Sequence, residues 1–385
     1  MNTNFVYGVG KTIKYYANLC YVIAVQTGLP AIAWGDPGEA KSAYMKALAK
    51  AMGRKFYHFI PSIHLPEDLS GIPVHNKAEA FAKMVPLQFM AACQEPGWLF
   101  FFDEVTTTGP QMRPPLLGLL EEGAVGDIKW HPTTIRCAAA NPPEWAPNGS
   151  PLEGALCNRM MHVQWQFPLQ QWLTGMENNC QFEVTDELPI VDMDVVKDAT
   201  LPFWSRRVSG YIRTNPSAVK LNRAPEEGEL AYPSPRTWHK LAVTLAAAAQ
   251  VHAPYEVYAE MGEGWVGKSA AAQFFQYVAS CDRYNPAEII DGTATPDYDE
   301  DRVDQLIHLP WVLVQELKSR SQQETLTDSG VTNAIECMIN MAEAGLMDCV
   351  IGPMGDVTDV APEYTMPTKL AGRFGKLVEQ VAVGD

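Results

Sequence analysis

The sequence predicts an α/β fold, an αβα sandwich around a parallel central sheet, followed by helical regions. Three short apolar segments, at 30–34, 99–102 and 134–140, have the length and composition of buried strands. Each runs into residues of the kinds that carry chemistry at the carboxyl edge of a parallel sheet. From residue 168 to about 250 the apolar residues recur at helical spacing instead. With 385 residues, 47% of them hydrophobic, the chain can bury the cores of two or three domains.

The first segment, PAIAW, runs into a glycine turn, a Lys-Ser pair and an alanine-rich helix that ends at Gly53. In the pattern G-x-x-x-x-G-K-[ST], backbone N–H groups surround phosphates, the lysine reaches the terminal phosphates and the hydroxyl binds magnesium. Ala40 stands where this pattern has its second glycine, which is tolerable if the φ of Ala40 is negative. A chance Gly-Pro turn is the alternative. We predict a nucleotide site made of Gly35, Asp36, Pro37, Gly38, Glu39, Ala40, Lys41 and Ser42.

The other two segments are each followed directly by polar residues. In GWLFFFDEV, Asp103 would hold Mg²⁺ together with Ser42, and Glu104 would orient and deprotonate the attacking water. In TIRCAAANPPE, two prolines end the strand after Asn141, whose amide could fix that water or the γ-phosphate. An acidic turn and a routine strand-end Asn are the alternatives for each segment alone. The acidic pair becomes an unlikely coincidence when a phosphate loop precedes it.

With these segments in order, the chain resembles the AAA+ ATPases, and within them the MoxR family. MoxR proteins commonly carry Ala before the P-loop lysine, as Ala40 does here. Residues 64–74, HLPEDLSGIPV, are similar to the family's D-L-x-G segment, which leads into an insertion within helix 2. Residues 84–90 are similar to its short GPL stretch, and residues 114–125, PPLLGLLEEGAV, to the helix after the acidic strand. The resemblance covers roughly residues 5–255.

The resemblance also assigns roles to residues outside these segments. Val9 and Gly10 resemble the family's V-G element near the adenine. Arg159, in ALCNRMMHV, is implied to be the finger that reaches the ATP of a neighbouring subunit. Arg236, in YPSPRTWHKLA, is implied to be the second sensor, which contacts the γ-phosphate from the same chain. Residues 124–132 alternate like one arm of a hairpin, which in the family projects toward the ring pore.

Two departures from the family concern the arginines. Thr106 and Thr107 stand where the family often has Asn-Arg, so the role of that arginine is lost or has moved, conceivably to Arg113. Asn158 replaces the Asp that usually precedes the finger.

We expect three regions along the chain. Residues 1–167 form the AAA+ αβα nucleotide-binding core, and residues 168–284 form a helical lid domain with a polar insertion at 200–233. Residues 285–385 form an acidic linker, 285–305, and a mainly helical C-terminal region. Within that region, apolar stripes predict two helices, at 331–344 and 370–381, that use the stripes for core packing.

The resemblance implies an ATPase that uses ATP and Mg²⁺, forms a ring, expected to be a hexamer, and remodels a partner protein. In the MoxR family that partner often bears a von Willebrand factor A domain, and chaperone-like activation of its complex is the implied role. Eight cysteines without C-x-x-C pairs suit a reducing cytoplasm. Polar residues interrupt the uncharged stretch at 15–35, so we expect no membrane span.

Two other functions remain as alternatives. A nucleic-acid motor of the restriction or helicase type would need cations on the insertion and the hairpin. These offer only Lys77, Lys83 and Lys129, and a net charge of −16 disfavours a phosphate-binding surface. A non-catalytic scaffold would not need the nucleotide-site residues Lys41 and Glu104. We therefore expect a protein client, with nucleic acid an unlikely partner.

Overall fold

The computed structural model of the chain describes residues 15–76, 81–145, 152, 154–184, 188–221, 229–281, 284–298, 306 and 309–382. These residues divide into two compact units. The larger unit comprises the described residues up to Ser205 together with Ser217–Ala272, and the smaller comprises Arg206–Pro216 and the described residues from Gln273 onward. Each unit has a hydrophobic core of its own.

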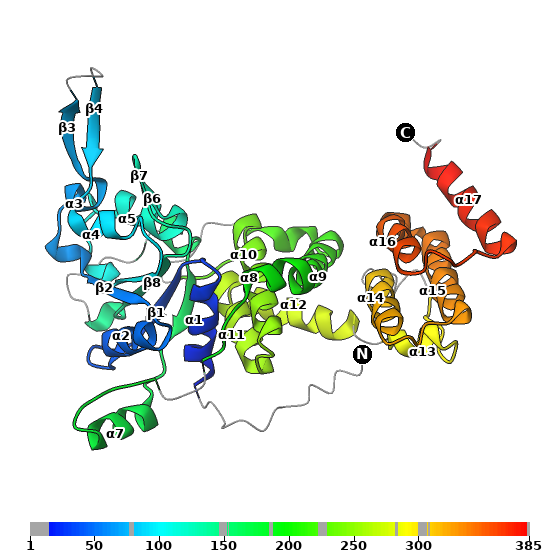
Figure 1. Cartoon of the computed structure of the whole chain (residues 1–385), viewed down its shortest axis with the longest axis horizontal. Coiled ribbons are helices and arrows are strands. Elements are labelled where there is room, and N and C mark those ends of the chain that lie inside the picture. Colours follow the sequence, from blue (N-terminus) through cyan, green and yellow to red (C-terminus); the bar gives the residue numbers. More distant parts are fainter. Residues whose placement is uncertain are drawn as a thin grey trace. The chain divides into compact units, whose positions relative to one another are not determined.

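Five parallel strands form the central sheet of the larger unit, in the order β2-β5-β8-β1-β9 (Figure 1). They are β1 (Ala31–Trp34), β2 (Lys55–Phe59), β5 (Trp98–Phe102), β8 (Ile135–Ala140) and β9 (Met161–Gln164). The predicted αβα sandwich with a parallel sheet is thus confirmed. The three strands predicted from the sequence are the inner strands β1, β5 and β8, because inner strands are buried on both faces and read as continuous apolar runs. The edge strands β2 and β9 lack that signal.

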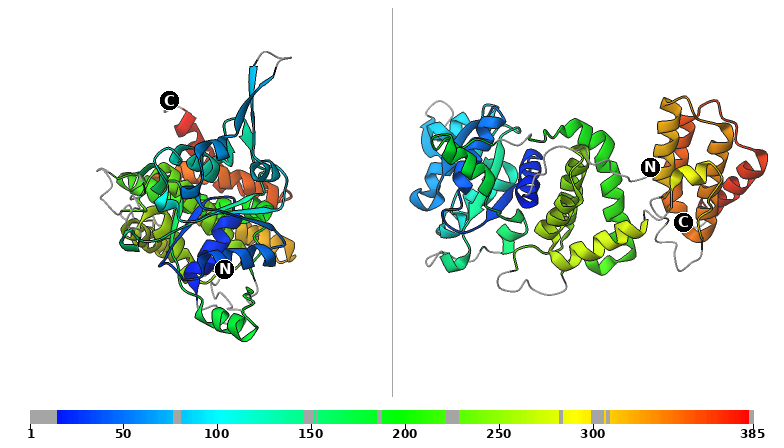
Figure 2. Two further views of the ribbon diagram at one scale, coloured as in Figure 1. Left: turned by 90° about the vertical axis from the view of Figure 1, so that its left-hand side faces the viewer. Right: turned by 90° about the horizontal axis from the view of Figure 1, so that it is seen from below.

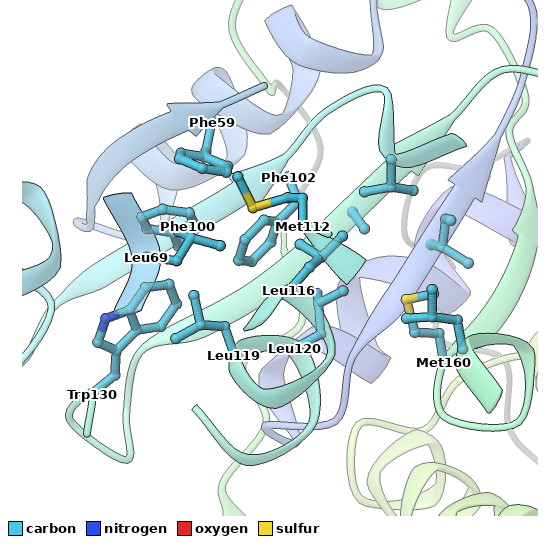
Figure 3. Close-up of a cluster of buried hydrophobic side chains, with 14 of the residues drawn as sticks. Phe59, Leu69, Phe100, Phe102, Met112, Leu116, Leu119, Leu120, Trp130 and Met160 are labelled. Atoms are coloured by element: carbon cyan, nitrogen blue, oxygen red, sulfur yellow. The ribbon is translucent and has the colours of Figure 1, made fainter. Parts of the chain in front are cut away.

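Helices pack against this sheet. They are α1 (Tyr16–Gln26), α2 (Lys41–Ala51), α3 (Pro66–Ser70), α4 (Gln88–Ala92) and α5 (Arg113–Glu122). On α5, three leucines at helical spacing, Leu116, Leu119 and Leu120, pack in one cluster with Phe100 and Phe102 of β5 (Figure 3). Burying each such leucine contributes about 1.5–3 kcal/mol. This packing holds β5 in place, and the end of β5 carries the acidic pair.

Two hairpins extend from the larger unit (Figure 1). The first, β3 (Ile72–Asn76) with β4 (Phe81–Val85), is the insertion implied after the D-L-x-G segment, and it also projects from the unit in the left view of Figure 2. The second pairs β6 (Ala124–Val125) with β7 (Ile128–Lys129). We predicted one arm of a hairpin at 124–132, whereas the structure has both arms within that segment.

Helices follow the sheet, as the spacing from residue 168 predicts. They are α6 (Gly154–Cys157) before β9, then α7 (Leu169–Glu177), α8 (Met193–Val195), α9 (Leu201–Thr214), α10 (Pro235–Gln250), α11 (Tyr255–Val266) and α12 (Lys268–Cys281). Ser234 caps α10, since its hydroxyl accepts from the Thr237 N–H at 3.1 Å while the Thr237 hydroxyl accepts from the Ser234 N–H at 2.8 Å. Among the described helices, none has the length and apolar composition needed to cross a bilayer.

The C-terminal part of the smaller unit is a helical bundle. Its helices are α13 (Pro286–Ile290), α14 (Leu309–Gln322), α15 (Asp328–Met341), α16 (Met347–Val360) and α17 (Thr368–Ala382). The two helices predicted at 331–344 and 370–381 are confirmed as α15 and α17. The exposed linker predicted at 285–305 is wrong at its start, because Ile289 and Ile290 of α13 are buried in the bundle core. This short apolar pair was missed because the residues around it are mostly polar or acidic.

Candidate functional site

The loop between β1 and α2 has the backbone that a phosphate cradle needs. Gly38 has a φ of +85°, and a β-carbon on Gly35 would lie 2.9 Å from the Trp165 β-carbon, so both positions require glycine. Ala40 adopts a φ of +58°, so the condition under which an alanine would be tolerable here, a negative φ, is not met. This left-handed conformation costs an alanine about 1–2 kcal/mol. Strain of this kind persists where the surrounding structure over-determines the backbone.

The same loop already holds a carboxylate on one of its N–H groups. Oε2 of Glu39 accepts a hydrogen bond from the Asp36 N–H at 2.9 Å. The carbonyl of Glu39 in turn accepts from the indole Nε1 of Trp165 at 3.1 Å, which ties the loop to the residue after β9. An N–H group that binds a carboxylate oxygen can bind a phosphate oxygen in its place.

The side chain of Lys41 bonds to the backbone of this loop. Its ammonium Nζ donates to the carbonyls of Gly35 at 2.7 Å and Asp36 at 2.8 Å, and to Oδ1 of Asn141 at 3.1 Å. Burial lowers the pKa of Lys41, while the nearby carboxylates of Glu39 and Asp103 act in the opposite direction. The structure therefore brings the strand-end amide of Asn141 directly to the phosphate lysine.

A hydroxyl and a carboxylate meet beside the lysine. The Ser42 hydroxyl donates to Oδ2 of Asp103 at 2.6 Å, across 61 residues of sequence. These two hard oxygen ligands suit Mg²⁺, which typically takes one or two protein oxygens and keeps waters and phosphate oxygens for its other positions. His58, at the end of β2, places its Nε2 2.9 Å from the same Oδ2 atom. The sequence pattern did not point to His58, because it lies on an edge strand with no motif of its own.

Glu104 follows Asp103 with an exposed side chain and a φ of +53°. Its N–H donates to Oδ1 of Asp103 at 3.0 Å, and its carbonyl accepts from the Thr107 hydroxyl at 2.8 Å. The left-handed backbone turns the chain after β5, and the two neighbouring carboxylates have different surroundings. One faces Ser42, and the other is available to water.

Part of this arrangement is similar to a known protein family. Residues 31–139, from β1 to β8, match the family described as the AAA domain of the dynein-related subfamily. A solved structure from Cytophaga hutchinsonii, described as a putative ATPase, is similar over 65% of this chain and 80% of its own, with 18% sequence identity and a TM-score of 0.45. No functionally curated protein matches the chain.

The two arginines named from the resemblance both pair with Glu121. Arg159 pairs through its Nε with Oε2 of Glu121, and the Nε of Arg236 lies 3.4 Å from Oε1 of the same carboxylate. Lys240 joins them, with Nζ 3.6 Å from Oε1 of Glu121 and donating to the Arg159 carbonyl at 2.7 Å. Burial lowers the pKa of Lys240 to about 8, which the charge of Glu121 opposes and that of Arg236 reinforces. We call these four residues the Glu121 cluster.

The Glu121 cluster lies at the amino edge of the sheet. Arg136, near the start of β8, donates to the carbonyls of Glu121 and of Gly28, which precedes β1. Arg159 likewise precedes β9, whose first N–H bonds to the residue before β1. The phosphate loop follows the opposite, carboxyl end of β1, and a four-residue strand spans about 13 Å. The arginines and the phosphate loop of one chain are thus at opposite edges of the sheet.

This placement bears on three predicted assignments. Among the described residues Arg236 pairs with Glu121, so the same-chain phosphate contact implied by the resemblance would require α10 to leave the amino edge. Arg113 begins α5 eight residues before Glu121, about 12 Å along the helix axis, and is outside the cluster. Val9 and Gly10 lie outside the described residues. The sequence pattern missed Glu121 and Lys240, although Glu121 stands in the Glu-rich turn that ends the helix after the acidic strand.

Proposed function

We propose that the protein is a Mg²⁺-dependent ATPase of the MoxR type. One observation carries the proposal: the Ser42 hydroxyl and Asp103 meet at 2.6 Å beside Lys41, whose ammonium lies among the loop carbonyls and Asn141. This is the residue set that phosphoryl transfer needs to bind terminal phosphates and a metal ion. Mg²⁺ held by Ser42 and Asp103 would neutralise charge that develops on the phosphate oxygens.

The chain's own residues would divide the remaining work. Lys41 binds the terminal phosphates, and the loop N–H groups orient them. Glu104 accepts a proton from the attacking water, since its carboxylate is exposed at the strand end rather than engaged with Ser42. Asn141, already bonded to Lys41, orients the water or the γ-phosphate.

We further propose that the protein works as a ring, with a hexamer as the expected form. Arg159 lies at the amino edge of its own sheet, so it is placed to serve the nucleotide of a neighbouring copy rather than its own. An arginine supplied in trans accelerates phosphoryl transfer by about 10³- to 10⁵-fold. Turnover per subunit should therefore rise with protein concentration.

The proposed client is a protein that the ring remodels or activates, and a protein with a von Willebrand factor A domain is the candidate. The β3–β4 hairpin supports a protein client. Its register puts Ile72, Val74, Phe81 and Val85 on one face, and each is roughly half exposed. Exposed apolar faces of this kind bind proteins, whereas nucleic-acid surfaces are rich in cations. Lys83, which lies opposite Val74 on this same face, is the only Lys or Arg on the described part of the hairpin.

Two variants test the nucleotide site. Lys41→Ala should abolish ATP binding, and Glu104→Gln should bind ATP normally while losing turnover about 10²- to 10⁴-fold. Binding of a fluorescent ATP analogue and release of phosphate measure the two effects separately. Equal ATP affinity in the wild type and Lys41→Ala would refute the assignment.

The client can be sought with the same variant. Glu104→Gln protein that is loaded with ATP should retain its client during affinity purification, because release follows hydrolysis. We expect a protein to be recovered. Recovery of nucleic acid that survives a high-salt wash would instead favour a nucleic-acid motor.

A further inference from the structure

The Glu121 cluster joins three elements that are distant in sequence. Glu121 ends α5, Arg159 precedes β9, and Arg236 and Lys240 lie in the first two turns of α10. The α10 cap adds another bond, since the Ser234 hydroxyl donates to Oδ1 of Asn158 at 2.9 Å. Both carboxylate oxygens of Glu121 are used, one by Arg159 and the other by the two cations of α10.

The cluster gathers three cations within an acidic protein. Arg159, Arg236 and Lys240 all lie against the carboxylate of Glu121, in a chain whose net charge is −16. Lys240 is buried and also lies 5.4 Å from the centre of the Trp265 ring. The two arginines are more accessible, with 23% and 41% of the Arg159 and Arg236 side chains exposed. Accessible guanidinium groups gathered at one place are suited to bind phosphate.

The position of the cluster identifies which phosphate it can bind. It stands at the amino edge of the sheet, whereas the phosphate loop of the same chain stands at the carboxyl edge. A second copy of the chain, placed head to tail as in a ring, can present its phosphate loop to this edge. The neighbour's ATP is thus the anion that fits the cluster.

We propose that Glu121 is a positioning residue that gathers Arg159, Arg236 and Lys240 into one phosphate-binding cluster for the ATP of a neighbouring copy. The delivery in trans rests on the ring proposed above. Glu121 fixes the arginine side chains, while Lys240 fixes the backbone at Arg159. Because Arg236 and Lys240 belong to α10, the lid helix and the finger move together.

Hydrogen exchange tests the positioning role without relying on the ring. In nucleotide-free Glu121→Gln, the amides of Thr237 and Trp238, which bond to Ser234, should exchange about tenfold faster than in the wild type. Glu122→Gln is the matched control, because Glu122 is the exposed neighbour of Glu121 on the same helix and should leave exchange unchanged. Unchanged exchange in Glu121→Gln would overturn the positioning role.

Subunit mixing tests delivery in trans. Glu121→Gln alone should keep ATP affinity within about twofold and lose turnover about 10- to 100-fold, the effect of misplacing a catalytic group by about 1 Å. Mixing it with Lys41→Ala, which keeps an intact cluster, should restore part of this turnover. Mixing it with Arg159→Ala, which does not, should restore none. Glu121→Asp keeps the charge and should lose less, and Glu122→Gln should match the wild type.

The possible failures are distinguishable. If Lys41→Ala and Arg159→Ala rescue each other but Glu121→Gln is rescued only by Arg159→Ala, Glu121 acts at its own nucleotide and the inference is wrong. Turnover of Glu121→Gln above the wild type would also overturn it, since Glu121 would then compete with phosphate for the arginines. If no pair of variants shows rescue, the ring proposal itself fails, and trans delivery fails with it.

Discussion

At the scale of single residues, two non-glycine residues of the site, Ala40 and Glu104, have a left-handed backbone conformation. Of these two, Ala40 directly precedes Lys41, the phosphate-binding lysine. An alanine in this conformation pays a steric cost that a glycine avoids. The site thus holds a strained alanine where the general loop pattern has an unstrained glycine.

Replacing Ala40 with glycine should therefore stabilise the protein. We expect Ala40→Gly to raise the free energy of unfolding by about 1 kcal/mol, because the relieved strain exceeds the extra entropy of glycine in the unfolded chain. Ala43→Gly, at an exposed position within α2, should lower it by about 1 kcal/mol. Urea denaturation of both variants measures the difference. Shifts of the same sign would show that Ala40 is not left-handed in solution.

At the scale of elements, a buried histidine links β9 to β1. The indole of Trp34 can only donate, so Nδ1 of His162 accepts from it at 2.9 Å, and Nε2 donates to the Cys157 carbonyl, also at 2.9 Å. This arrangement needs a neutral ring. Burial lowers the pKa of His162 to about 4, against which the bond to Cys157 acts.

This histidine should make the larger unit sensitive to acid. Between pH 6.5 and about 4 the unfolded chain binds a proton at His162 and the folded chain does not, so stability falls as the pH falls. The full loss is on the order of 3 kcal/mol. The amide of Gln in His162→Gln can accept and donate at similar positions. The free energy of unfolding of this variant should therefore differ less between pH 7 and pH 4.5 than that of the wild type. His239→Gln, on the exposed face of α10, should retain the wild-type difference, and equal pH dependence in all three proteins would exclude His162 as the cause.

At the scale of the whole molecule, the two units have separate hydrophobic cores. The helices α9 and α12 each contain residues of both units. All described residues of the nucleotide site belong to the larger unit. Units with separate cores can unfold in separate steps. The chain therefore offers a direct readout of which unit binds nucleotide.

Calorimetry of Glu104→Gln, which should bind ATP without consuming it, should show two unfolding transitions. ATP at about one hundred times its dissociation constant should stabilise the larger unit by about 2.7 kcal/mol and leave the other transition in place. Lys41→Ala should show both transitions without the ATP effect. A single transition that moves as a whole would show that the continuous helices couple the two units.

The sequence by itself determined the elements whose signals are local. The inner strands β1, β5 and β8 are apolar runs that end at Gly35, Asp103 and Asn141, and the stripes of α15 and α17 have helical spacing. The tertiary structure alone decided which distant side chains meet: His58 at Asp103, and Glu121 with Arg159, Arg236 and Lys240. It also decided the left-handed φ of Ala40. Local periodicity reports whether a residue is buried, but partners 38 or more residues apart are set by strand order and helix packing, which no short stretch of sequence encodes.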